Sequence, residues 1–288
     1  MKIAIATDSN SGISAREAEQ LGVFLIPMPV IIDDQTLLEG VDIETVQLFD
    51  AMEGDKNVSS SQPAPGSVTQ LWDGILVQGY DAIVYIPMTS GLSGSCQSAA
   101  MLAEDYDGKV FVVDNHRISV TQRASVLDAI RLADAGLTGA QIKEKLEAAS
   151  FDASIYLTVA DLKYLQRGGR LSSSAAVLGT LLNIKPMLTI QGYQVDVVAK
   201  LRGMKACEKK MIESLQQDIA DRFGEIPREK LRVDAGGTLM TKEEQEQWRT
   251  EVQEAFPDRN VEYVTLPCSI SVHLGPGCRA LAVSVEAI

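Results

Sequence analysis

The sequence predicts an α/β protein with two domains: an N-terminal α/β domain on a parallel sheet and a C-terminal α+β domain with a mixed sheet. In the first half of the chain, apolar strand patterns alternate with helix patterns. The second half instead carries a hairpin pattern and two late strands. At 288 residues the chain is also long for one core, because hydrophobic cores stop growing near ~250–300 residues.

The N-terminal domain is expected to span residues 1–150. Its inner strands are "DAIVYIP" and "KVFVVD", since continuous apolar runs are typical of parallel strands covered on both faces. Ligands of such sheets bind beyond the carboxyl ends of the strands. The other expected elements are a strand over 2–9, helices over 45–53, 67–77, 94–105, 121–136 and 138–150, and a loop over 57–66.

Two further elements of this domain are marked by particular residues. Ser14 is a candidate N-cap, and Gly22 a candidate C-terminal glycine, of a helix over 14–22. Residues 23–32 predict one strand, which Pro27 and Pro29 place at an edge or bend.

The C-terminal domain is expected to span residues 151–288. Residues 185–203 predict a hairpin that turns at Gly192. Residues 261–275 and 278–288 are expected to form two closing strands. The other expected elements are strands over 153–160 and 230–237 and helices over 161–169, 173–183, 204–223 and 242–256.

Composition indicates an ordinary globular protein, with 45% hydrophobic and 23% charged residues. No apolar run approaches the ~18 residues that span a bilayer, and the N-terminal apolar run reaches Asp8 too soon for a secretory signal. We therefore expect a cytoplasmic protein without stable membrane insertion. The four cysteines form no CxxC pair, so they are expected to be reduced.

The net charge of −13 disfavours nucleic acid and anionic lipid surfaces as partners. One segment, from Asp161 to Lys210, departs from this average, because nine basic residues against three acidic residues give it a charge of +6. Such a segment is either a set of solvated faces or a docking surface for an acidic protein.

Serines gather at two turns of the N-terminal domain. Ser59, Ser60 and Ser61 precede a Gln-Pro pair, and Ser93 follows a predicted strand at the start of a helix. Serines at such places usually cap the local backbone. Two clusters at the carboxyl side of one sheet also favour recognition of an anion by hydroxyls and helix N-terminal amides.

A hydrolase is an alternative, since "GLSGS" partly matches the nucleophile elbow G-x-S-x-G and fails at its second glycine. Ser93 would be the nucleophile and His116 or His273 its base.

Other chemistry has less support in the sequence. The chain contains no Walker-type or kinase-type glycine loop, so no ATP site is predicted. Cys268, His273 and Cys278 would face alternate sides of an extended segment, which argues against a metal site.

Taken together, the motifs resemble the DegV family of bacterial fatty-acid-binding proteins. The resemblance covers nearly the whole chain, and its central block is highly specific. The matching segments are "ATDSNSGI", "SSSQPAPG", "TSGLSGSCQSA", "DLKYLQRGGRLSSSAAVLGTLLNIKPMLTIQGY", "LRGMKA" and "HLGPG".

The resemblance implies a long-chain fatty acid, such as palmitate, stearate or oleate, buried between the two domains. Proteins of this kind are not enzymes in the usual view and need no cofactor. They present the fatty acid carboxylate to a separate fatty acid kinase, which makes an acyl phosphate for phospholipid metabolism. A regulatory protein that senses lipid would share the same pocket, and the sequence leaves that alternative open.

Individual residues acquire roles through the same resemblance. The implied carboxylate-binding residues are Ser60, Ser61, Ser93, Gly94 and His273. Arg202, in "LRGMKA", matches a position that the family associates with kinase docking. Given that role, the basic segment with Arg170, Lys200 and Arg202 is the expected docking surface. The apolar wall around the acyl chain is expected from residues 26–32 and 174–187, both of which are equally consistent with plain core.

The chain departs from the family pattern at two informative positions. Asn115 stands where the family usually has serine, and Asp234 stands where a histidine often ends the strand. These departures put the preferred acyl chain in question more than the fold.

Overall fold

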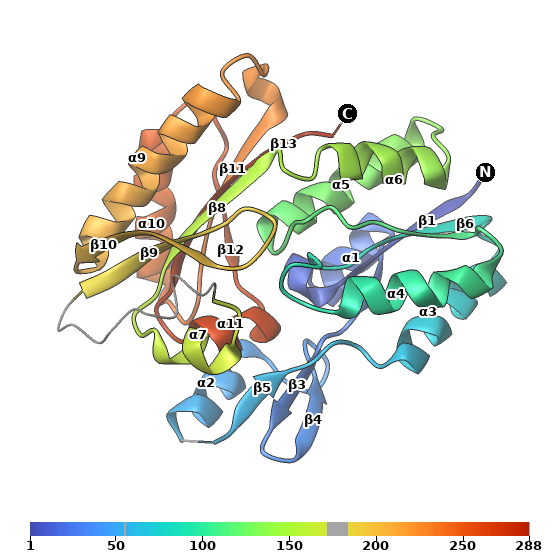
Figure 1. Cartoon of the computed structure of the whole chain (residues 1–288), viewed down its shortest axis with the longest axis horizontal. Helices are drawn as coiled ribbons and strands as arrows, with labels where there is room; N and C mark the ends of the chain where they lie inside the picture. Colours follow the sequence, from blue (N-terminus) through green and yellow to red (C-terminus); the bar gives the residue numbers. More distant parts are fainter. Residues whose placement is uncertain (55, 172–183, 288) are drawn as a thin grey trace.

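The computed structural model describes residues 1–54, 56–171 and 184–287. Three sheets organise these residues (Figure 1). The α/β class is confirmed, with a parallel sheet in the N-terminal half and a mixed sheet in the C-terminal half.

The N-terminal sheet has the strand order β2-β1-β6-β7, and all its pairings are parallel. Both faces of this sheet carry apolar side chains, and helices bury them: α1, α5 and α6 pack on one face, and α3 and α4 pack on the other. The strands are β1 (Ile3–Asp8), β2 (Phe24–Ile26), β6 (Ala82–Ile86) and β7 (Val110–Val112). The helices are α1 (Ala15–Leu21), α3 (Pro65–Val77), α4 (Ser95–Ala103), α5 (Val120–Asp134) and α6 (Gly139–Ala148), with short 3₁₀ turns η1 (Ser9–Ser11) and η2 (Glu104–Tyr106).

The predicted ends of the first helix are confirmed. The Ser14 hydroxyl accepts a hydrogen bond from the Glu17 backbone N–H, which satisfies one of the free amides of the first turn of α1. Gly22 ends the helix in the left-handed region at a φ of 67°.

A small antiparallel sheet, with the order β4-β3-β5, is separate from this parallel sheet and was not predicted. Its strands are β3 (Pro29–Ile32), β4 (Gln35–Leu38) and β5 (Val58–Ser60), and α2 (Thr45–Glu53) packs with it. The single strand expected over 23–32 is therefore wrong: it is interrupted at Pro27, and its two halves join different sheets. The loop expected over 57–66 is wrong at its start, where β5 pairs with β3.

The C-terminal sheet has the order β10-β9-β8-β13-β11-β12. One face is covered by α9 and α10, and the other faces the N-terminal domain. Its strands are β8 (Ala153–Thr158), β9 (Ile184–Ile190), β10 (Asp196–Arg202), β11 (Leu231–Gly237), β12 (Glu262–Thr265) and β13 (Arg279–Val285). The helices are α7 (Lys163–Gly168), α9 (Met204–Arg222), α10 (Lys242–Ala255) and α11 (Cys268–Leu274), with a 3₁₀ turn η3 (Arg228–Lys230).

The hairpin that turns at Gly192 is confirmed, although its connection spans residues 191–195 instead of two residues. The strand expected over 261–275 is wrong in its second half, because residues 268–274 form α11. Pro267 is the N-cap residue of that helix. Proline has no backbone N–H to donate to a neighbouring strand, so it readily ends a strand. The helix expected over 173–183 lies outside the described residues.

Within the described ranges, no helix combines the length and the apolar character that crossing a bilayer requires.

Candidate functional site

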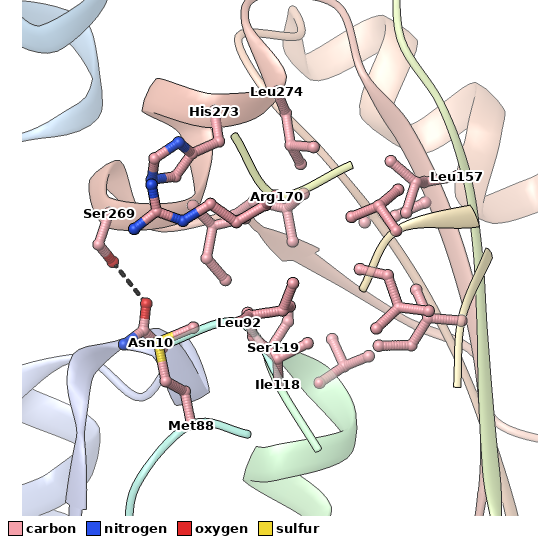
Figure 2. Close-up of a pocket in the computed structure, with 18 of the residues that line it drawn as sticks. Asn10, Met88, Leu92, Ile118, Ser119, Leu157, Arg170, Ser269, His273 and Leu274 are labelled. Atoms are coloured by element: carbon pink, nitrogen blue, oxygen red, sulfur yellow. Dashed lines mark hydrogen bonds between the residues drawn. The ribbon is translucent and has the colours of Figure 1, made fainter. Parts of the chain in front are cut away.

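A cavity lies where the C-terminal sheet faces the N-terminal domain. The space between its atoms, its opening included, is about 970 Å³. Apolar side chains form most of its lining, and they come from β8, β9, β13, α5, α7 and α11 and from the loops between these elements. Figure 2 shows the labelled polar side chains of Arg170, Ser269, His273 and Asn10 on one side and Leu157 on the other. The cavity is thus a mostly apolar space with a polar end.

At the polar end, Ser60 and His273 are brought together from distant parts of the chain. Ser60 ends β5, and His273 lies on α11. The Ser60 Oγ lies 2.8 Å from the His273 Nε2, and both residues line the cavity. Burial and the positive charge of Arg170 lower the pKa of His273 to about 4. The ring is therefore neutral near pH 7, and it can donate or accept a proton in a hydrogen bond.

Arg170 also lines the cavity, and its guanidinium points toward the His273 ring (Figure 2). It donates a hydrogen bond to the Gly168 carbonyl, which fixes the side chain near the polar end. The sequence had suggested docking for this residue. The structure places it beside the serine–histidine pair, whereas Lys200 and Arg202 are exposed on β10.

The turn after β6 supplies further polar groups. The Ser93 hydroxyl accepts a hydrogen bond from the Ser95 backbone N–H at 3.1 Å, so it caps the first turn of α4 while it lines the cavity. A Cβ on Gly94 would lie 3.3 Å from the Gln62 Oε1, the end of a flexible side chain, and Gly94 itself is not among the described residues that line the cavity. Ser61 also lines the cavity, and its hydroxyl donates to the Gln62 carbonyl at 3.1 Å.

The same turn is held against the β9–β10 hairpin. The Thr89 hydroxyl donates a 2.6 Å hydrogen bond to the Gly192 carbonyl. A Cβ on Gly91 would lie only 2.6 Å from that carbonyl oxygen and from the Tyr193 Cα. Glycine is therefore required at position 91, and the contact fixes the wall of the cavity near Ile190 and Val195.

A buried polar network that the sequence did not indicate supports α11. The Glu39 carboxylate accepts hydrogen bonds from the Ser9 hydroxyl at 2.5 Å and from the Ser269 hydroxyl and backbone N–H at 2.8 and 3.1 Å. The Ser269 hydroxyl also lies 2.9 Å from the Asn10 Oδ1 (Figure 2). Desolvation raises the pKa of Glu39, against these hydrogen bonds. The network joins the N-terminal domain to the helix that carries His273.

The expected apolar wall is present in part. Met28 lines the cavity, whereas Val30 and Ile32 pack in the core beneath the small sheet. Most of the second expected wall, residues 174–183, lies outside the described residues.

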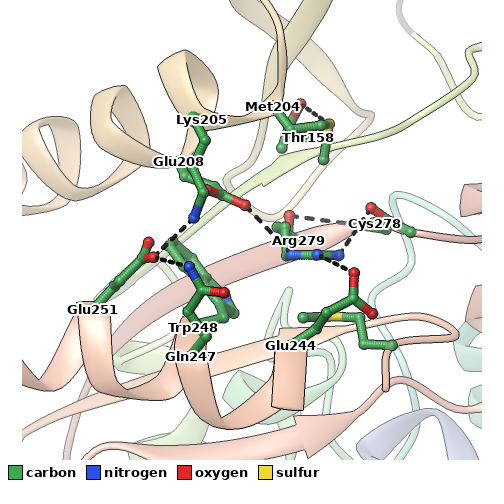
Figure 3. Close-up of polar contacts among 12 residues, drawn as sticks. Thr158, Met204, Lys205, Glu208, Glu244, Gln247, Trp248, Glu251, Cys278 and Arg279 are labelled. Atoms are coloured by element: carbon green, nitrogen blue, oxygen red, sulfur yellow. Dashed lines mark hydrogen bonds and ion pairs between the residues drawn. The ribbon is translucent and has the colours of Figure 1, made fainter. Parts of the chain in front are cut away.

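Much of the basic segment is neutralised locally. Lys205 pairs with Glu208 and Glu251 at 2.9 and 2.8 Å, within the network that joins α9 and α10 to Arg279 (Figure 3). Lys163 pairs with Asp161 at 3.2 Å. Lys200 and Arg202 have no ion pair among the described residues, so their charges remain available on the surface of β10.

The geometry gives the hydrolase alternative no catalytic pair. Within the described parts of the chain, neither histidine ring has a hydrogen bond with Ser93; His273 contacts Ser60, and His116 stacks on Phe151 at 4.9 Å between ring centroids. Those parts likewise contain no group of three or more His, Cys, Asp or Glu that could hold a metal ion.

Comparisons with known proteins agree with one another. The model of a family described as "Uncharacterised protein, DegV family" matches residues 2–286. A DegV domain-containing protein of Listeria monocytogenes is 32% identical over 287 residues, which cover 99% of each chain.

Solved structures show the same fold. A fatty-acid-binding DegV family protein from Thermus thermophilus has a TM-score of 0.88 and 26% identity, with 99% of this chain and 100% of that chain covered. The fatty acid binding protein DegV from Bacillus subtilis has a TM-score of 0.86 and 27% identity, with the same coverage. A stearic-acid-binding protein from Eubacterium ventriosum has a TM-score of 0.87 and 25% identity, with 99% of each chain covered.

Proposed function

The chain belongs to the DegV family, and we propose on this basis that it binds a long-chain fatty acid such as palmitate, stearate or oleate in the cavity between its two domains, 1–150 and 151–288. The observation that carries the proposal is a mostly apolar cavity with the Ser60–His273 pair at its polar end. Relatives described as fatty-acid-binding support it.

The apolar lining accounts for affinity. Burying an acyl chain contributes ~0.8 kcal/mol per methylene, or roughly 11 kcal/mol for a sixteen-carbon tail before the costs of association and ordering. Carbon–carbon contact is non-directional, so the tail alone does not fix the orientation of the ligand.

The polar end supplies orientation. A buried carboxylate is costly unless donors surround it. The hydroxyls of Ser60, Ser61 and Ser93 and the imidazole of His273 line the cavity and can act as such donors. We propose that the backbone N–H of Gly94, next to Ser93 at the N-cap of α4, adds another. We expect Arg170 to add a positive charge at this end, beside His273.

A carrier role follows from the same arrangement. We propose that the protein is not itself an enzyme and that it presents the bound carboxylate to a fatty acid kinase, which forms an acyl phosphate used in phospholipid metabolism. The exposed, unpaired charges of Lys200 and Arg202 on an edge strand suit docking of an acidic partner surface.

Native mass spectrometry of the purified protein, followed by denaturing extraction, tests the binding proposal. We expect a one-to-one complex that releases a fatty acid. A protein that is empty and also takes up no added oleate or palmitate would refute it. Labelling of Ser93 by a fluorophosphonate would instead favour a hydrolase, because a carrier serine is not activated.

A further inference from the structure

One carboxyl group lines the mostly apolar cavity, on the side formed by the C-terminal sheet. Asp234 is the only acidic residue among the described residues that line it. Its neighbours on the cavity side of the sheet are small and apolar: Gly236 on the same strand, and Ala280 and Ala282 on β13. These small residues leave space above the sheet at the point where the carboxyl group stands.

The strand pattern explains why Asp234 faces the cavity. Along β11, Leu231, Val233 and Ala235 pack into the core beneath α9 and α10. Successive side chains of a strand point to opposite faces, so Asp234 and Gly236 point the other way, toward the N-terminal domain.

The strand register sets Asp234 back from the segment that carries His273. Strand β12 ends at Thr265, which pairs with Gly237 of β11. The chain leaves the sheet there and continues into α11, the helix that carries His273. Asp234 lies three residues earlier on β11, about 10 Å back at ~3.3 Å per residue. On this register we place Asp234 along the path of the proposed acyl tail and not at its carboxylate.

The carboxyl group has no hydrogen bond or ion pair within the described parts of the chain. Arg123, whose positive charge acts on Asp234, is itself engaged by Glu17 at 2.6 Å and by Glu262 at 3.5 Å. Burial, reinforced by the negative charge of Glu262 on the neighbouring strand, raises the pKa of Asp234 to about 7, against the effect of Arg123. Asp234 is half-buried, and a carboxyl group held partly out of water without a partner is costly unless a ligand or water completes its hydrogen bonds.

We propose that the preferred ligand is a hydroxylated long-chain fatty acid, whose tail hydroxyl exchanges a hydrogen bond with Asp234. The inference rests on the proposed fatty-acid binding and adds the class of acyl chain. A hydroxyl suits both protonation states of Asp234, because it can donate a hydrogen bond to the carboxylate and accept one from the carboxylic acid. An unsubstituted tail would instead bury the carboxyl group against methylenes.

The competing explanation is hydration from the other side. Asp234 and Val120 also border a second cavity, which is lined mainly by charged side chains including Arg123, Arg232 and Glu262. Water in that cavity could complete the hydrogen bonds of Asp234 without any tail hydroxyl. The two explanations differ in what they predict for ligand preference.

Competition binding distinguishes them. The delipidated full chain is titrated with octadecanoic acid, 10-hydroxyoctadecanoic acid and 12-hydroxyoctadecanoic acid, with 3-hydroxyoctadecanoic acid as the positional control. We expect at least one of the two tail-hydroxylated acids to bind about tenfold more tightly than octadecanoic acid, and the 3-hydroxy acid to show no such gain. Asp234→Leu should remove the preference and bind octadecanoic acid more tightly, while Asp234→Asn, which can still donate and accept, should keep part of it.

Each outcome has one meaning. Equal affinities for all four acids in the wild type, or an unchanged ratio in Asp234→Leu, would overturn the hydroxyl inference and leave fatty-acid binding intact. Failure of the wild type to bind any of the four acids would overturn both proposals. The wild-type comparison needs no variant, so it still decides between the two explanations if Asp234→Leu fails to fold.

Discussion

Ser60 and His273 are 213 residues apart in the sequence, yet the Ser60 Oγ and the His273 Nε2 lie 2.8 Å apart at the polar end of the cavity. One comes from the small antiparallel sheet and the other from the short helix α11. Because the pair joins two separately built parts of the molecule, its geometry depends on how those parts pack.

Loss of the Ser60 hydroxyl should weaken fatty-acid binding. A hydrogen bond to a charged group contributes about 1.5–3 kcal/mol, so Ser60→Ala is expected to raise the Kd for stearate by about tenfold or more. Ser60→Thr keeps the hydroxyl and should bind close to normally. Ser59→Ala is the matched control, since Ser59 is adjacent, exposed and absent from the cavity lining. Equal Kd values for Ser60→Ala and Ser59→Ala would remove Ser60 from the carboxylate site.

Fatty-acid binding should take up protons in mildly acidic solution. The pKa of His273 is lowered to about 4 by burial and by Arg170, so the free protein holds a neutral ring at pH 6. A carboxylate next to the ring favours imidazolium and raises this pKa. Calorimetric titration of stearate in two buffers of different ionisation enthalpy measures the uptake. The uptake should be smaller in His273→Gln, and identical values in both proteins would contradict the assignment.

Glu39 should stabilise the fold through α11. Glu39→Ala removes the acceptor of three hydrogen bonds from Ser9 and Ser269, and we expect a loss of roughly 1–3 kcal/mol in the free energy of unfolding. Urea denaturation measures this loss. Glu19→Ala, a change at an exposed glutamate of α1, should leave stability within about 0.5 kcal/mol. If both variants unfold at the same urea concentration, the network does not anchor the helix.

Charge reversal on the edge strand β10 should separate kinase coupling from lipid binding. Arg202→Glu is expected to slow acyl phosphate formation by an added fatty acid kinase while the Kd for stearate stays unchanged, because Arg202 is exposed and outside the cavity lining. Arg16→Glu makes the same change of charge on exposed α1 and should have no effect. Parallel loss of lipid binding in Arg202→Glu would show that the residue supports the pocket instead.

The sequence predicted the N-terminal parallel sheet and the helices on its two faces well, for a physical reason. "DAIVYIP" and "KVFVVD" are apolar throughout because β6 and β7 are covered on both faces, and that pattern is readable without tertiary knowledge. The small sheet was missed because β5 consists of Val58 and two serines, which have little strand propensity of their own. Its pairing with β3 is a tertiary effect.

The site was predictable only in part, for a related reason. Ser60, Ser93 and His273 stand in short motifs, and the structure brings all three to the cavity. Glu39 stands in no motif and acquires its role from burial against Ser9 and Ser269. The helix α11 was missed because its isoleucine and valine residues favour strands locally.

Asp234 should make the protein less stable as the pH rises. In the unfolded chain an aspartate titrates near pH 4, whereas burial raises the pKa of Asp234 to about 7 in the folded protein. Between these values the folded state holds a proton that the unfolded state has lost. The contribution of Asp234 to stability is therefore greatest below pH 4 and declines as the pH rises through 7.

Asp234→Asn isolates this effect, since it replaces the carboxyl group with a neutral group of the same shape. The difference in unfolding free energy, variant minus wild type, should grow with pH by on the order of 1–4 kcal/mol between pH 5 and pH 8. The difference is the right quantity because Asp128, whose pKa burial raises to about 6, titrates in both proteins. Denaturation curves at four pH values in delipidated protein measure it. A constant difference across this range would mean that Asp234 is already ionised and hydrated, and the hydroxylated-ligand inference would lose its electrostatic support.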